Sequence, residues 1–303
     1  MVEELFDDVL EFPDPDAQER FSRLIGIDEV KQRIVREATL LLDPEKITKW
    51  SETHHGKVIR AATELAERTP LIILAGDVGT GKTELAETFL DEVVRKTHSK
   101  GTLYAMSLSV RGKGGVGEMT KLISDAMATI RDAGRKAVNN NHVIVLLIDE
   151  GDALAQSREM SQMHHEDRVG VNAILKGIDA LRRAHLPVLT VLCTNRVDSI
   201  DPALRRRAAA SIELERPNSD QRREILSELL EGLDVSSEDL DQLVELTGPR
   251  HSRDYGMTYS DIRQRLIPES VLSVFDSGPL TAEVIIESAK GLEPTRPFNG
   301  VIK

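Results

Sequence analysis

The sequence predicts an α/β fold in which a five-stranded parallel sheet is followed by a small all-helical domain. Short apolar runs, often β-branched, alternate with helical patterns, which is typical of a parallel sheet covered on both faces. After Pro217 the strand signals stop and only amphipathic helical patterns remain. The expected strands are Leu71–Ala75, Thr102–Met106, Val143–Ile148, Pro187–Cys193 and Ser211–Glu215.

Helical patterns precede, separate and follow these strands. Residues 28–43 form one expected helix, which ends at Asp43-Pro44, and a second polar helix fills much of 45–67. In the last third of the chain the expected helices lie around 218–231, 237–247, 259–274 and 280–290.

The chain therefore divides into four expected parts. Acidic side chains crowd residues 1–20, which we expect to form a solvated, flexible arm. Residues 21–217 form the expected nucleotide-binding α/β domain, and residues 218–290 a small all-helical domain. Residues 291–303 contain Pro294, Pro297 and Gly300 and form an expected irregular tail. A length of 303 residues is enough for these two domains.

Composition narrows the classes of partner and compartment. The formal net charge is −12, whereas a chain that binds nucleic acid normally carries a basic surface, so the balance disfavours nucleic acid. The sequence has no stretch of 18 apolar residues, which disfavours a membrane partner, and its N-terminus is acidic where a signal peptide is basic. The single cysteine, Cys193, fits a reducing compartment and is expected to be a small core residue. We expect a cytoplasmic protein.

A phosphate-binding motif directly follows the first expected strand of the sheet. Gly76–Thr83 reads GDVGTGKT and opens a helix, which is the context that the pattern G-x-x-x-x-G-K-[ST] requires. Its glycines let backbone N–H groups wrap phosphates, Lys82 supplies charge, and the Thr83 hydroxyl can ligate Mg²⁺. The expected cofactor is ATP with Mg²⁺, and the expected cofactor-binding residues here are Gly79, Thr80, Gly81, Lys82, Thr83 and Glu84.

Two further strands end in polar residues that complete a catalytic arrangement. Asp149 and Glu150 follow a buried strand, whose carboxyl end is where ligands bind in open α/β sheets. Asp149 is the expected second metal-site residue, and Glu150 the expected general base for an attacking water. Asn195 follows the next strand and is expected to orient that water, although an asparagine there is also a common turn former or helix cap.

Together these motifs resemble the AAA+ superfamily of P-loop ATPases. Gly76–Thr83 is similar to Walker A, Asp149-Glu150 to the end of Walker B, and Asn195 to sensor 1. The helical domain 218–290 is similar to the AAA+ lid domain. Ser260–Arg263 is similar to sensor 2, which implies that Arg263 senses the γ-phosphate. Leu24–Ile27 is similar to the segment that packs on adenine, which implies nucleotide contacts from Ile25 and Gly26.

Two longer segments resemble the pachytene-checkpoint-2 family of AAA+ proteins. Asp167–Asp179 is similar to the helix after the second pore loop, and Ile200–Ala208 to the arginine-finger segment. The resemblance implies a homo-hexamer that opens HORMA-domain proteins, in the compact bacterial form found in antiphage operons beside a HORMA protein and a cyclic-nucleotide synthase. In the run Arg205–Arg207 we expect Arg207 to be the finger, while a solvated basic surface is the alternative.

The expected function is an ATP-hydrolysing ring that opens a closed HORMA-domain protein by pulling a terminal segment through its pore. Residues 110–117 and 156–169 are the expected pore loops, although the first lacks the bulky aromatic residue usual in the family. One alternative is a DNA-linked AAA+ ATPase such as a clamp loader or helicase loader, which the acidic balance disfavours. Another alternative is a nucleotide-gated scaffold that hardly hydrolyses ATP. The presence of Glu150, the expected general base, disfavours it.

Overall fold

The computed structural model describes residues 5–108, 118–151, 164–195, 200–250 and 253–297, and it separates into two compact units. The first unit comprises Met1–Phe21, Glu29–Ala75 and Thr83–Glu213. The second comprises Ser22–Asp28, Gly76–Lys82 and Leu214–Lys303. Within the described part of the chain no helix is both long and apolar enough to cross a membrane.

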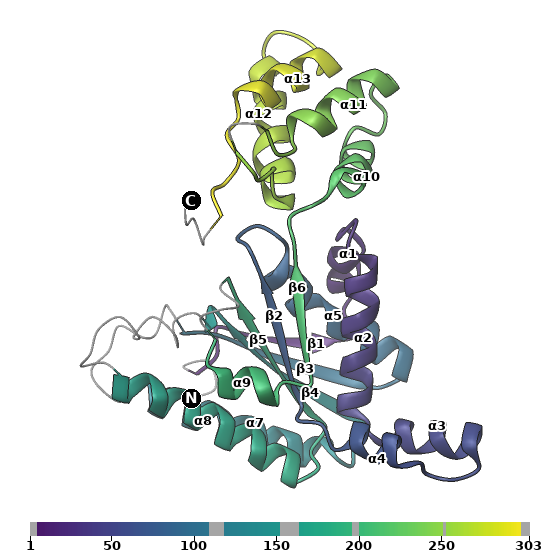
Figure 1. Ribbon diagram of the computed structural model, residues 1–303, viewed down its shortest axis with the longest axis vertical. Helices are drawn as coiled ribbons and strands as arrows, with labels where there is room; N and C mark the ends of the chain where they lie inside the picture. Colours follow the sequence, from purple (N-terminus) through teal and green to yellow (C-terminus); the bar gives the residue numbers. More distant parts are fainter. Residues whose placement is uncertain (1–4, 109–117, 152–163, 196–199, 251–252, 298–303) are drawn as a thin grey trace. The chain divides into compact units, whose positions relative to one another are not determined.

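A six-stranded sheet forms the centre of the first unit, with the order β1-β3-β4-β5-β2-β6 (Figure 1). The pairs β3–β4, β4–β5 and β2–β5 are parallel, as the near-continuous apolar strands predict. All five expected strands are present, so the α/β class is confirmed. They are β2 Leu71–Gly76, β3 Lys100–Ser107, β4 His142–Asp149, β5 Val188–Thr194 and β6 Ala210–Leu214.

The sixth strand and the helix after it correct the expectation of a flexible N-terminal arm. Strand β1, Asp8–Phe12, pairs antiparallel with β3, and α1, Pro15–Ser22, follows it, so the sheet is mixed rather than wholly parallel. The segment is acidic overall, but it also contains buried apolar residues: Phe6 and Phe12 are only 2% and 3% exposed. Because β1 is an edge strand, its acids also protect the sheet from pairing with another chain.

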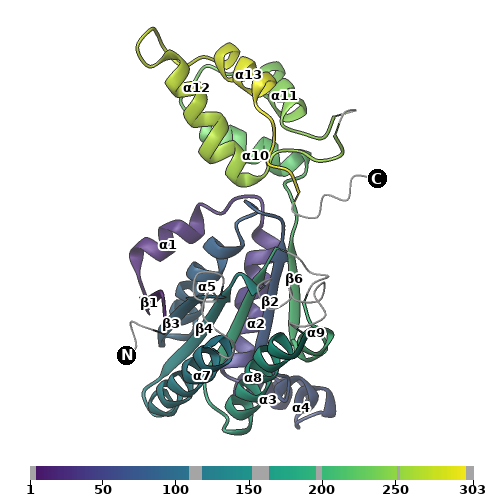
Figure 2. The same ribbon diagram turned by 90° about the vertical axis from the view of Figure 1, so that its left-hand side faces the viewer.

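Helices cover both faces of the sheet (Figure 2). Helices α7 and α8 lie on one face, and α2 and α5 on the other. The expected polar helix over 45–67 is two helices, because Gly56 adopts a left-handed conformation and ends the first of them. The helices of this unit are α2 Asp28–Leu42, α3 Glu45–His55, α4 Arg60–Ala66, α5 Lys82–Thr97, α7 Glu118–Ala137, α8 His164–Arg183 and α9 Pro202–Arg207.

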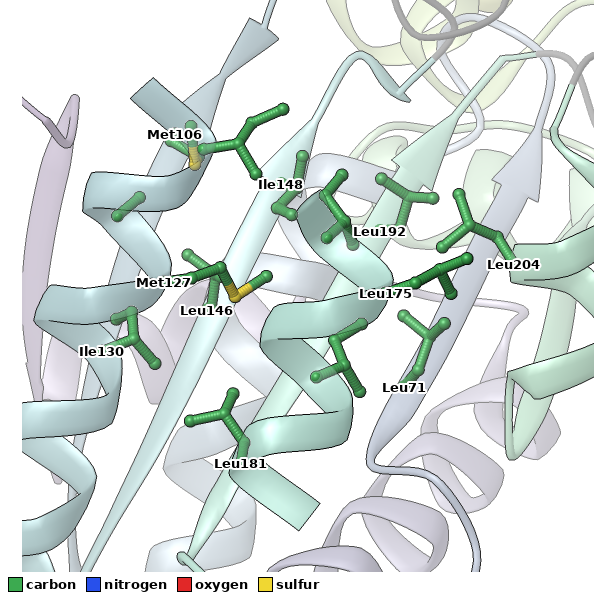
Figure 3. Packing of buried hydrophobic residues seen from close by; sticks show 14 of the residues in the cluster. Leu71, Met106, Met127, Ile130, Leu146, Ile148, Leu175, Leu181, Leu192 and Leu204 are labelled. Carbon is green, nitrogen blue, oxygen red and sulfur yellow. The ribbon is translucent and has the colours of Figure 1, made fainter. Parts of the chain in front are cut away.

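A hydrophobic cluster between the sheet and helices α7 and α8 fixes the strand ends that carry the polar residues (Figure 3). Strands β2, β4 and β5 contribute Leu71, Leu146 and Leu192, which are buried. The two helices approach closely at Gly177 of α8. A Cβ there would lie only 2.6 Å from the Met127 sulfur of α7, so a larger residue would not fit without a shift. Close packing of this kind holds the backbone at the sheet edge in one arrangement.

The second unit is largely helical, and its helices match the four patterns expected after Pro217. Two of them begin with reciprocal capping boxes, Asn218 with Gln221 and Ser236 with Asp239. The expected helix over 259–274 starts as a π-helix, Asp261–Leu266, before α12, Ile267–Val274. The others are α10 Ser219–Leu229, α11 Ser237–Leu246 and α13 Ala282–Gly291. The lid boundaries at 218 and 290 stay a prediction.

Candidate active site

The loop after β2 has the backbone conformation of a phosphate cradle. Gly76, Gly79 and Gly81 have φ values of 150°, 77° and 93°, which side-chain-bearing residues rarely adopt. A Cβ on Gly76 would overlap the Leu214 carbonyl oxygen, and one on Gly79 would lie 2.7 Å from the Thr258 hydroxyl oxygen. Only glycine fits at these positions, and glycine-rich turns of this kind are typical of loops whose backbone N–H groups bind an anion.

The main-chain carbonyl of Asp77 accepts hydrogen bonds from two side chains of this loop. The Lys82 ammonium donates a 2.7 Å hydrogen bond to it, and the Thr80 hydroxyl donates one of 2.8 Å. The Asp77 carboxylate accepts a 2.8 Å hydrogen bond from the Val78 N–H. Because Lys82 is only 6% exposed and Thr80 only 1%, these contacts fix where the lysine charge lies within the loop.

The two predicted metal-site residues come together although they are 66 residues apart in sequence. The Thr83 hydroxyl, in the first turn of α5, donates a 2.9 Å hydrogen bond to the Asp149 carboxylate at the end of β4. A hydroxyl beside a carboxylate is a ligand set suited to Mg²⁺, which binds few protein oxygens and keeps most of its waters. This pair therefore fits a magnesium ion.

Glu150, the predicted general base, sits directly beyond β4 in a strained backbone conformation. Its φ is 55°, in the left-handed region, and its N–H donates a 2.7 Å hydrogen bond to the Asp149 carboxylate. Its own carboxylate accepts a 2.7 Å hydrogen bond from the Ser107 hydroxyl at the end of β3. Backbone strain at such a position is common at active sites, where the surrounding structure holds it.

Ser107 is a site residue that the sequence analysis missed. Its only sequence signal is that it directly follows the predicted strand Thr102–Met106, which is expected to lie in the same sheet as the strand before Asp149. The structure pairs Ser107 with Asp149 in the β3–β4 register, which places the serine beside the predicted base. The Asp7 carboxylate also accepts a 2.6 Å hydrogen bond from the Ser107 N–H, so the N-terminal segment contacts this end of β3.

Asn195 lies at the expected edge of the sheet. It follows Thr194, the last residue of β5, and the order of strands puts β5 between β4 and β2. Thr194 pairs with Ala75 at the end of β2. The carboxyl ends of adjacent parallel strands meet at one edge, so Asn195 is at the edge that carries Asp149. Its role in orienting water stays a prediction.

The segment that the resemblance assigns to adenine lies against the phosphate-binding loop. A Cβ on Gly81 would be 3.5 Å from the Leu24 side chain. Ile25 packs on the helical cluster of the second unit, and the Gly26 carbonyl accepts a hydrogen bond from the Gln221 side chain. The structure thus places Leu24 of this segment beside the loop and packs Ile25 and Gly26 against helices of the second unit. The contact of Ile25 and Gly26 with nucleotide stays a prediction.

The Glu84 side chain is occupied by a salt bridge in the first unit. Its two oxygens accept hydrogen bonds of 2.8 and 3.0 Å from the Arg20 guanidinium, and the pairing with Glu84 is the largest effect that raises the Arg20 pKa. The backbone N–H of Glu84 lies in the first turn of α5, where N–H groups have no partner within the helix. The backbone N–H is therefore the group with which Glu84 would contact a phosphate.

The two predicted phosphate-sensing arginines each form an ion pair within their own unit. Arg207, at the end of α9, lies 3.3 Å from the Asp179 carboxylate of α8. Arg263, in the π-helix, lies 3.2 Å from the Glu228 carboxylate of α10. Both pairs are partly exposed, and such pairs contribute little to stability, so either arginine can exchange its partner at low cost.

Most of the two expected pore loops falls outside the described residues, namely residues 110–117 and 156–163. The second loop was expected to extend to residue 169, but α8 begins at His164, so its last residues are helical.

Comparison with known proteins adds evidence from outside this chain. Residues 72–218 match the family "ATPase family associated with various cellular activities (AAA)". The chain is 44% identical to CD-NTase-associated protein 6 of Escherichia coli strain MS 115-1, over 98% of this chain and 97% of that protein. It superposes with a TM-score of 0.91 on a chain of the solved E. coli MS115-1 HORMA:CdnC:Trip13 complex, at 44% identity and with 98% and 99% of the two chains covered. The structure of Rhizobiales Trip13 gives a TM-score of 0.77 at 38% identity, with 96% and 100% covered.

Proposed function

The chain belongs to the family of the CD-NTase-associated protein 6 proteins, which are AAA-type ATPases, and we propose that it hydrolyses ATP with Mg²⁺ to remodel a HORMA-domain protein. The family resemblance predicted from sequence is thereby confirmed. The observation that carries the enzymatic part of the proposal is the 2.9 Å contact between Thr83 and Asp149, which joins the phosphate-binding loop's helix to the end of β4.

Each site residue has a chemical role in this proposal. Lys82 and the N–H groups of the loop bind the phosphates, while Thr83 and Asp149 hold the metal and its waters. Mg²⁺, when bound, neutralises charge on the phosphate oxygens. Glu150 accepts the proton of the attacking water, and Asn195 orients that water through its side-chain amide. The Ser107 hydroxyl fixes the direction of the Glu150 carboxylate.

The partner is proposed from the solved complex of the E. coli relative, which contains a HORMA protein and CdnC. We infer that this chain likewise acts on a HORMA-domain protein, in bacterial antiphage signalling and in the cytoplasm. The working species is an oligomer, because an arginine finger such as Arg207 acts on the γ-phosphate of a neighbouring subunit. The family resemblance favours a homo-hexamer. In this proposal the pore-loop residues 110–117 and 156–163 then grip a terminal segment of the substrate and pull on it.

The proposal is tested with a HORMA protein locked closed around a fluorescent peptide. Addition of the purified chain, ATP and Mg²⁺ should release the peptide, whereas ATP with a chelator or ATP with Lys82→Ala protein should not. Release by the wild-type chain without ATP would contradict an ATP-driven mechanism. Strong stimulation of ATP hydrolysis by DNA, without peptide release, would favour a DNA-linked ATPase instead.

A further inference from the structure

Arg216, just beyond β6, forms an enclosed ion pair with Asp77 of the phosphate-binding loop. Its Nε donates a 2.8 Å hydrogen bond to the Asp77 carboxylate, and one terminal nitrogen donates to the same oxygen. The two side chains are only 13% and 17% exposed. A shielded, charge-assisted contact of this kind is stronger than an exposed pair.

The same guanidinium also holds two other segments of the second unit. One terminal nitrogen donates a 2.7 Å hydrogen bond to the Gly256 carbonyl, and the other a 2.8 Å hydrogen bond to the Thr295 carbonyl. The guanidinium lies 5.1 Å from the centre of the Tyr255 ring, within the range of a cation–π contact. One side chain thus links the phosphate-binding loop to the segment that follows α13.

Asp261 fixes that C-terminal segment from the other side. Its carboxylate is fully buried and accepts hydrogen bonds from the Thr295 N–H at 3.0 Å and from the Thr295 hydroxyl at 2.6 Å. It also accepts one from Arg265, at 2.7 Å. Thr295 is therefore held at three points, its N–H and hydroxyl by Asp261 and its carbonyl by Arg216.

We propose that Arg216 is a positioning residue for nucleotide binding, and that the C-terminal segment around Thr295 supports the phosphate-binding loop through it. The inference rests on the proposed ATPase function. Asp77 transmits the effect, because its carbonyl accepts the hydrogen bond from Lys82 while its carboxylate is held by Arg216. A loop held in place before the ligand arrives loses less conformational entropy on binding, which raises affinity.

The first measurement is the affinity for a fluorescent ADP analogue. Arg216→Gln should weaken binding on the order of 10-fold, the loss typical of one charge-assisted hydrogen bond. Arg216→Lys should recover part of it, because lysine keeps the charge but not the forked geometry. Thr295→Val and Asp77→Asn should each weaken binding less than Arg216→Gln. The matched control is Arg223→Gln, whose arginine pairs with Asp241 on the exposed surface and should bind like wild type.

The second measurement uses protein without nucleotide, so that it does not depend on turnover. Amide hydrogen exchange in residues 76–82 and 292–296 should be faster in Arg216→Gln than in wild type, and unchanged in Arg223→Gln. If Arg216→Gln does not fold, Asp77→Asn provides the same comparison, because it removes the carboxylate and leaves the arginine in place.

The outcomes separate this inference from the proposed function. Wild-type protein that binds no nucleotide, or a Lys82→Ala variant that binds it normally, would contradict the ATPase assignment itself. The positioning role of Arg216 would be overturned if Arg216→Gln and Asp77→Asn both showed normal nucleotide binding and normal amide hydrogen exchange. If Lys82→Ala failed to bind nucleotide in the same assay, the ATPase assignment would remain intact.

Discussion

The Ser107 hydroxyl donates a 2.7 Å hydrogen bond to the carboxylate of Glu150, the proposed general base. The two residues come from the ends of neighbouring parallel strands, whose register also sets Ser107 opposite Asp149. Since the Ser107 N–H is in turn bound by Asp7, the N-terminal segment contributes to the same arrangement. Residues outside the Walker motifs therefore help to orient the proposed base.

Glu150→Gln should keep nucleotide binding and stop hydrolysis. The amide has nearly the shape of the carboxylate but cannot accept the proton of water, and loss of a general base typically lowers the rate by about 10²–10⁴. The check is steady-state ADP production together with the affinity for a fluorescent nucleotide. Glu213→Gln, an exposed glutamate on β6, is the matched control and should behave like wild type. Wild-type turnover by Glu150→Gln would reject Glu150 as the base.

Ser107→Ala should lower kcat by roughly 10-fold and leave nucleotide affinity unchanged. Without the hydroxyl, the Glu150 carboxylate samples directions that do not face the attacking water, and misorientation of a catalytic group lowers the rate steeply. Ser107→Thr retains a hydroxyl and should restore most of the activity. An Ser107→Ala variant with weaker nucleotide binding and unchanged kcat would show that the serine acts on the loop and not on the base.

Local motifs made part of this site predictable. Thr83 belongs to a continuous motif and Asp149 ends a predicted strand, so the sequence could suggest that they meet, and the structure joins them by a hydrogen bond. Ser107 and Arg216 carry no such pattern, because each matters through a partner that is distant in sequence. The strand Asp8–Phe12 was missed for a different reason, since acidic residues on an edge strand resemble a flexible arm when only composition is considered.

The charge on Asp261 should stabilise the second unit at neutral pH and not in acid. Burial by itself would raise the pKa of this carboxyl, but hydrogen bonds from Thr258, Thr295 and Arg265 together outweigh burial and lower the pKa. A folded-state pKa below the unfolded value of about 3.9 means that the stabilisation is complete above that pH and is lost as pH falls through the folded-state pKa.

The check is the free energy of unfolding of wild type and Asp261→Asn across this range. Asp261→Asn should cost about 1–3 kcal/mol near pH 7, because its amide presents donors to groups that already donate. The difference between the two proteins should shrink below about pH 4. Asp254→Asn removes an exposed acid nearby and serves as the control. A difference that grows in acid would reverse the assigned direction of the pKa shift.

Arg207→Ala should abolish hydrolysis in the assembled protein without weakening nucleotide binding. In the single chain Arg207 is paired with Asp179 across 3.3 Å, and assembly would exchange this partner for the γ-phosphate bound by a neighbour. Arginine fingers in related phosphoryl-transfer enzymes raise the rate by about 10³–10⁵. Asp179→Asn is the informative companion variant, because it releases Arg207 from its pair and should leave hydrolysis at or above the wild-type rate.

Mixing two inactive variants tests whether the site is shared between subunits. Subunits with Arg207→Ala retain the base Glu150, and subunits with Glu150→Gln retain the finger. In a mixed ring some interfaces join an intact finger to an intact base, so ADP production should reappear and should be largest near equal proportions. Each variant alone, at the same total concentration, gives the baseline.

A fully active monomer by light scattering, or the absence of any recovery in rings shown to be mixed, would exclude a finger in trans at this position. The finger would instead be Arg206 if three results came together. Arg207→Ala alone would hydrolyse ATP like wild type, Arg206→Ala alone would be inactive, and mixing Arg206→Ala with Glu150→Gln would restore activity.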